Sequence, residues 1–119
     1  MPRLGNYLQA CAREDAGAAP PSVRYGEDVC AECHMILSEP KFAAALYDGR
    51  EWKKFDDIGC MDVYRKNHGV SGTAWVHDYE SGSWLREGEA DFVVSKDLRT
   101  PMGYGKVARL KERTRENDI

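Results

Sequence analysis

Residues 42–58, FAAALYDGREWKKFDDI, decide the fold of this 119-residue chain. The apolar run that begins at Phe42 ends at Asp48-Gly49, a dipeptide typical of the turn between two antiparallel strands. Glu51–Phe55 then returns as the second strand. Asp56-Asp57 follows, with carboxylates that suit the cap of a helix. The stretch therefore predicts a β-hairpin that leads directly into a helix.

The residues that follow extend this unit by a helix and a third strand. Apolar positions from Ile58 to about Asn67 fit a short helix, and His68-Gly69 ends it, because glycine readily adopts the left-handed conformation found just after a helix. Thr73–Tyr79 is rich in aromatic and β-branched residues, which favour a strand. We expect the order strand, strand, helix, strand in the first half of the chain.

The second half predicts a similar but less complete unit. Trp84-Leu85 and Asp91–Val94 read as short strands, and a loop covers Thr100–Gly105. The charged segment from Lys106 to about Glu116 has a weak apolar stripe and alternating charges, which favour a solvated helix. No closing strand is expected after it. The fold class is therefore α+β, with two small ββαβ-type units of which the second is incomplete.

Length and charge limit the classes of function. The chain has 17 basic and 20 acidic residues and a net charge of −3, and both signs are interspersed along it. A nucleic-acid-binding domain normally carries a basic surplus, so nucleic acid is a disfavoured partner. No stretch of about 18 apolar residues is present that could span a membrane. The size fits one domain with a core that needs no disulfides.

The first 28 residues read as a tail, and residues 29–119 as the folded domain. Leu8-Gln9-Ala10 before Cys11 resembles the lipobox of bacterial lipoproteins, in which the cysteine receives a lipid. Met1–Tyr7 supplies no apolar run of a signal peptide, so an unmodified Cys11 in a disordered tail stays open as the alternative. Small residues and Pro20-Pro21 follow, which is typical of a tether.

Sulfur-bearing residues concentrate in a few short segments. The segment CAECHM holds Cys30, Cys33, His34 and Met35 within six residues, and Cys60-Met61 and Met102 add three sulfurs downstream. Thiolates and thioethers form a soft ligand set, which selects Cu(I) among biological metals. A thioether binds hard ions poorly, so the methionines favour Cu(I) over zinc. The sequence therefore predicts a soft-metal site.

Other interpretations of these residues stay open. Cys30-x-x-Cys33-His34 matches the signature of covalent c-type haem attachment, with Met102 as a candidate axial ligand. Small c-type cytochromes are helical, however, and residues 42–94 read as rich in strands.

Three further alternatives use the same cysteines. A zinc site would combine Cys30, Cys33 and Cys60 with His68 or His77. A thiol–disulfide oxidoreductase would use the C-x-x-C pair, although such motifs usually precede a helix, which lowers the thiol pKa. Structural cysteines and packed methionines without any chemistry are the remaining alternative.

Four blocks in order resemble the NosL family, the copper-binding accessory proteins of nitrous oxide reductase assembly. They are Cys33-x-Met35, Phe55–Met61, Val76–Tyr79 followed by Trp84, and Thr100–Gly103. Members of that family are typically lipid-anchored outside the cytoplasmic membrane. Their fold is similar to a pair of ββαβ units related to a domain of organomercurial lyase. The resemblance implies the same for this chain.

The resemblance also implies a ligand set. It places Cu(I) on Cys33 and Met102, with Met35 close by. The family usually has glycine where His34 stands, so His34 is a possible extra ligand. Cys30 is either a spare ligand or a redox partner of Cys33.

Three residues are weaker candidates. His77 is a plausible auxiliary ligand, while Cys60 and Met61 fall on the predicted helix, where core packing is favoured for at least one of them. The hypothesis from sequence is an extracytoplasmic Cu(I) chaperone and not an enzyme. It would hold copper in an open, low-coordinate site and deliver it to a cuproenzyme such as nitrous oxide reductase.

Overall fold

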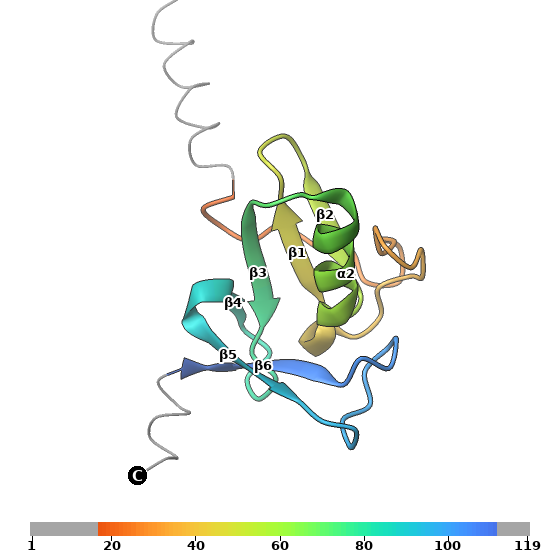
Figure 1. Cartoon of the computed structure of the whole chain (residues 1–119), viewed down its shortest axis with the longest axis vertical. Coiled ribbons are helices and arrows are strands. Elements are labelled where there is room, and N and C mark those ends of the chain that lie inside the picture. The colour runs from red at the N-terminus through yellow and green to blue at the C-terminus, as the bar shows by residue number, and fades with distance from the viewer. Residues whose placement is uncertain (1–16, 112–119) are drawn as a thin grey trace, which may run out of the picture.

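The computed structural model describes residues 17–111 and has the predicted hairpin and helix at its centre (Figure 1). The elements in chain order are η1 (Pro40–Phe42), β1 (Ala44–Tyr47), β2 (Trp52–Phe55), α2 (Ile58–His68), β3 (Thr73–His77), β4 (Trp84–Arg86), η2 (Glu87–Glu89), β5 (Ala90–Val94) and β6 (Lys106–Leu110). The fold class α+β is confirmed, with one helix of several turns among the described residues. None of the helices in this range is long and apolar enough to cross a membrane.

A four-stranded antiparallel sheet in the order β2-β1-β3-β4 forms the body of the protein. Helix α2 lies across one face of it, and the β5–β6 hairpin lies beyond one end of that sheet (Figure 1). Cross-strand partners point to the same face, so the register places one apolar set beneath α2: Ala44, Leu46, Phe55, Val76 and Leu85. This buried layer holds the helix, whose own stretch of 11 residues would be marginal alone.

Helix α2 begins and ends with the predicted signals. The Asp57 carboxylate accepts a hydrogen bond from the Gly59 N–H, as an N-cap does. Gly69 follows the helix with φ 61°, and its N–H donates to the carbonyl of Arg65. Both ends therefore lie where the sequence predicts them.

In the described part of the charged segment that follows the Thr100–Gly105 loop, Lys106–Leu110 is a strand and not the expected helix, and residues 112–119 lie outside the described range. Lys106–Leu110 pairs antiparallel with β5, so that Val107 lies opposite Val93 and Ala108 opposite Phe92. Ala108 also bridges to Asp78 beside β3, and it is fully buried. Pairing and burial outweigh the local helical preference of the charged residues here.

The second unit consequently differs from the expected one. Between β4 and β5 the chain forms only the short 3₁₀ turn η2, and β6 itself is the closing strand. In residues 17–111 no second helix packs on the β5–β6 hairpin, so the structure does not confirm a pair of ββαβ units. The large sheet with α2 alone follows the predicted order.

The end of the expected tether packs on the sheet. The Trp75 indole N–H donates to the carbonyl of Gly17 at 2.9 Å, and Arg86 donates to the carbonyl of Ala18 at 3.0 Å. The N–H of Gly26 donates to the carbonyl of Leu37 at 2.8 Å. Residues 17, 18 and 26 therefore make hydrogen bonds with the folded part, while Cys11 lies outside the described residues.

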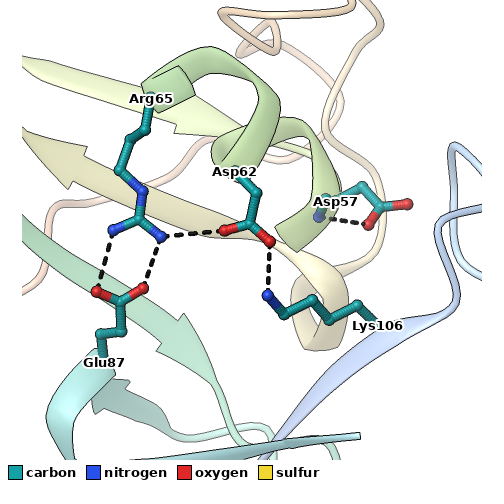
Figure 2. Close-up of polar contacts among 6 residues, drawn as sticks. Asp57, Asp62, Arg65, Glu87 and Lys106 are labelled. Carbon is teal, nitrogen blue, oxygen red and sulfur yellow. Dashed lines mark hydrogen bonds and ion pairs between the residues drawn. The ribbon is translucent and has the colours of Figure 1, made fainter. Parts of the chain in front are cut away.

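An ion-pair network joins α2 to the second half of the chain (Figure 2). Arg65 donates to both carboxylate oxygens of Glu87 in η2, at 3.0 and 2.6 Å. Asp62 accepts from Arg65 at 3.0 Å and from Lys106 of β6 at 2.6 Å. Half-exposed pairs each contribute little, but a bidentate arginine adds geometric specificity. The network sets the position of β6 relative to the helix.

The buried carboxylate of Asp57 makes a second connection between these parts. One oxygen caps α2, as Figure 2 shows, and the other accepts from the Thr100 hydroxyl at 2.6 Å and from the Met102 N–H at 3.0 Å. The N–H of Gly105 in turn donates to the Thr100 hydroxyl. A single side chain thus fixes the 100–105 loop against the first turn of the helix.

Replacement of Asp57 by alanine should lower the free energy of unfolding by about 3 kcal/mol, because it removes a helix cap and leaves two buried donors without an acceptor. Urea denaturation followed by tryptophan fluorescence measures this. Asp48→Ala is the matched control, since the Asp48 carboxylate also accepts two backbone N–H groups but lies in an exposed loop. Equal losses in the two variants would contradict the role of Asp57 as a buried link.

Candidate metal centre

Three cysteines and one aspartate meet beside the first turn of α2. The sulfurs of Cys30, Cys33 and Cys60 and a carboxylate oxygen of Asp56 all lie within 4.8 Å of one another. None of the three cysteines forms a disulfide. Thiolate and carboxylate are both metal ligands, so this group, called the Cys₃Asp cluster below, could hold a metal ion.

The CAECHM segment forms a tight turn that aims its two sulfurs at the cluster. Val29 and Ile36 bridge at its base, and the Cys30 N–H donates to the carbonyl of Met35 at 2.8 Å. The Cys33 N–H points at the Cys30 sulfur at 3.5 Å, and the Met35 N–H donates to the Cys33 sulfur. Such N–H groups stabilise a thiolate, so the backbone of the turn is arranged for charged sulfur.

His34 occupies a strained position in this turn. Its φ is 67°, and no other non-glycine residue in the described range has a positive φ. Glycine adopts this conformation without steric cost, whereas histidine does not. The His34 side chain is exposed, and its imidazole does not belong to the Cys₃Asp cluster.

Asp56 is the member of the cluster that sequence reasoning missed. Its carboxylate accepts from the Cys33 thiol at 3.3 Å and from the Cys60 thiol at 3.6 Å, and it is 5% exposed. The two adjacent aspartates looked like a helix cap, but only Asp57 caps the helix. The sequence did contain a signal for a second role of Asp56. One N-cap position needs only one carboxylate, so one of the two adjacent aspartates was left for another function.

Burial controls the protonation of the thiols. The pKa of Cys33 is raised to about 11, mainly by burial; the neighbouring Cys30 and Asp56 contribute to the rise, and the Met35 N–H opposes it. Burial also raises the pKa of Cys60 far above its usual range, as do the neighbouring thiols and Asp56. Both thiols therefore keep their protons at neutral pH until a cation supplies the missing positive charge.

The predicted methionine ligands differ in their burial. Met35 is 57% exposed and Met102 is 42% exposed. The Met102 N–H is bound to Asp57, the neighbour of Asp56, so the Met102 loop reaches the same end of α2 as the cluster. Met61 is fully buried in the core beneath the helix.

The two other histidines lie in different surroundings. His77 Nδ1 lies 2.9 Å from the Ala43 carbonyl oxygen, and the centroid of its ring lies 3.7 Å from that of Trp84. His68 is exposed and stacks on Tyr64 at 4.2 Å. Neither histidine joins the three cysteines. The zinc interpretation expected a histidine as the fourth ligand, and the structure has Asp56 beside the cysteines instead.

The geometry also bears on the haem and oxidoreductase alternatives. Cys30 is fully buried, so a haem bound covalently there would require the turn to open. Thiol–disulfide enzymes depend on a cysteine with a lowered pKa, whereas burial raises the pKa of Cys33. Metal binding is the chemistry that the cluster suits best.

No protein-family model and no curated protein matches this chain. The chemistry of the centre therefore rests on its own residues.

Metal binding should release protons from Cys33 and Cys60, since both thiols are protonated in the metal-free protein and bind metal as thiolates. In weakly buffered solution at pH 7, addition of the metal should release about two protons from these groups. Cys33→Ser should reduce the count by about one. Metal binding without proton release would show that the two thiols are already ionised in the metal-free protein.

His77 should make stability depend on pH. Burial lowers the pKa of His77 below its ordinary value of 6.5, while the Ala43 carbonyl opposes the shift. The unfolded chain therefore binds the proton more readily, and the free energy of unfolding should fall as the pH drops below about 6.5 towards the lowered pKa.

Urea denaturation between pH 7.5 and 5 tests this expectation. The His77→Gln variant should lose that part of the pH dependence, because glutamine does not titrate. The exposed His68 provides the matched control, and His68→Gln should keep the wild-type profile. The same profile in His77→Gln as in the wild type would assign the effect to other groups.

Proposed function

We propose that this protein is a Cu(I) carrier that holds the ion on the thiolates of Cys30, Cys33 and Cys60. The observation that carries the proposal is the convergence of these three sulfurs from two separate segments. Three thiolates form a soft, negatively charged set that suits a soft monovalent cation. Such a cation also compensates the negative charge of the buried thiolates, since burial keeps Cys33 and Cys60 protonated in its absence.

The exposure of the cluster supports transfer rather than permanent storage. Cys30 and Cys60 are buried, whereas Cys33 is partly exposed. A sulfur from an acceptor protein could therefore approach the ion on the side of Cys33 without prior dissociation. The half-exposed thioethers of Met35 and Met102 lie at the turn and the loop beside the cluster and would add weak ligands during exchange.

Zinc is the second candidate, and the position of Asp56 favours it. Three thiolates and one carboxylate make a four-ligand set that zinc accepts. Cu(I) gains little from a hard oxygen ligand. The role of Asp56 therefore separates the two metals: it is a ligand for zinc, and a hydrogen-bond acceptor beside the site for Cu(I).

The wider role follows the resemblance to NosL proteins. In this proposal the chain is a metallochaperone and not an enzyme, it works outside the cytoplasm, and a lipid on Cys11 holds it at the membrane. Its partner is a copper-accepting enzyme or the assembly complex of that enzyme, such as that of nitrous oxide reductase. The resemblance supports these points, and the Cys₃Asp cluster supports the metal binding on which they depend.

Competition titrations against chelators of known affinity test the choice of metal. Cys33→Ser should weaken Cu(I) binding by about 100-fold, equivalent to about 2.7 kcal/mol, because one of three thiolates is lost. Asp56→Asn should leave Cu(I) affinity within about threefold of the wild type but weaken zinc binding by about 100-fold. An Asp56→Asn variant that loses Cu(I) as strongly as zinc would contradict the Cu(I) assignment.

Met102→Leu tests the thioether in the same titration. We expect a loss of Cu(I) affinity of up to about tenfold, as for a weak ligand added to a thiolate set. Met61→Leu is the matched control, since this methionine is fully buried in the core. An equal effect in both variants would remove Met102 from the site.

A further inference from the structure

Tyr104 rests directly on the helix turn that carries the metal cluster. A Cβ added to Gly59 would overlap the Tyr104 side chain, so the aromatic ring lies against the bare backbone of the first turn of α2. The next residue along the helix is Cys60, whose thiol belongs to the cluster. Glycine at position 59 is thus the condition for the close approach of this ring.

The loop on both sides of Tyr104 is fixed in place. Gly103 and Gly105 flank it with φ 80° and 66°, conformations that favour glycine. Gly105 donates to the Thr100 hydroxyl at 3.0 Å, and its carbonyl accepts from the Ser95 N–H at 2.9 Å. The backbone therefore presents the tyrosine to the helix, and only the side-chain torsions remain free to move the ring.

Tyr104 also lies within the electrostatic reach of the cluster. Burial raises the pKa of its phenol, and ionisation of the nearby Cys60 thiol would raise it further. The phenol is consequently neutral near pH 7. At the same time the residue is 43% exposed, so the ring lies between the helix turn and solvent.

We propose that the ring of Tyr104 is a lid that shields Cys60, and through it the Cys₃Asp cluster, from reagents and competing ligands in solution. Cys60 is 1% exposed although it lies in the first turn of the helix, close to the exposed loop. The ring against Gly59 blocks the approach of solutes to Cys60 from the side of the 100–105 loop. Access to the cluster remains at the partly exposed Cys33. The role of the lid in copper exchange rests on the proposed function. The shielding of Cys60 does not, because the ring lies against the helix in the metal-free protein.

Alkylation of the metal-free protein tests the lid without any metal. Reduced protein is exposed to iodoacetamide at pH 8, and modification of each cysteine is followed by mass spectrometry. Tyr104→Ala should increase the rate of Cys60 alkylation by about tenfold, which corresponds to a free-energy barrier lower by about 1.4 kcal/mol. Tyr104→Phe keeps the ring and should react at the wild-type rate.

Tyr79→Ala controls for a general loss of stability, because Tyr79 packs on Phe42 and is not part of the cluster. An unchanged rate at Cys60 in Tyr104→Ala would overturn the lid. So would an equal increase in Tyr79→Ala, since the increase would then reflect global opening.

Transfer of Cu(I) from the loaded protein to bicinchoninate forms the second arm. Tyr104→Ala should transfer the ion faster than the wild type, and Tyr104→Phe should transfer it at the wild-type rate. Equal rates for all three proteins would overturn the role of the lid in copper exchange and limit the lid to the thiols of the metal-free protein. A wild-type protein that binds no Cu(I) would end the proposed function, and the alkylation rates would still decide the lid.

Discussion

The carboxylate of Asp57 is the constraint on which the rest of the structure depends. It is fully buried, and it accepts hydrogen bonds from the helix start and from the 100–105 loop at once. The helix start carries Cys60, and the loop carries Met102 and Tyr104. Because one group holds both, the position of the loop against the first turn of α2 is coupled to the folding of the helix.

The Cys₃Asp cluster carries a conflict of charge that the protein alone does not resolve. Backbone N–H groups of the CAECHM turn favour thiolates, yet burial raises the pKa of Cys33 and Cys60. A bound cation removes the conflict, since it compensates the charge of the thiolates in the buried site. Affinity for a soft cation and inertness of the metal-free thiols therefore have the same physical origin.

The arrangement is asymmetric, and the asymmetry suits exchange. Cys30 and Cys60 are buried, whereas Cys33 is partly exposed and two half-exposed methionines lie nearby. The ring of Tyr104 covers the helix side of the centre, where Gly59 admits it. An ion held in this way would be protected on one side and open to an incoming ligand on the other.

Local sequence determined the elements whose signals lie within a few residues. The Asp48-Gly49 turn, a carboxylate cap at Asp56-Asp57 and the Gly69 end of α2 were all predicted. Tertiary structure decided the rest. Lys106–Leu110 became a strand because β5 and Asp78 offered partners, and Asp56 became part of the cluster because the turn placed Cys33 beside it. These outcomes depend on contacts between residues far apart in the chain, and no local pattern encodes such contacts.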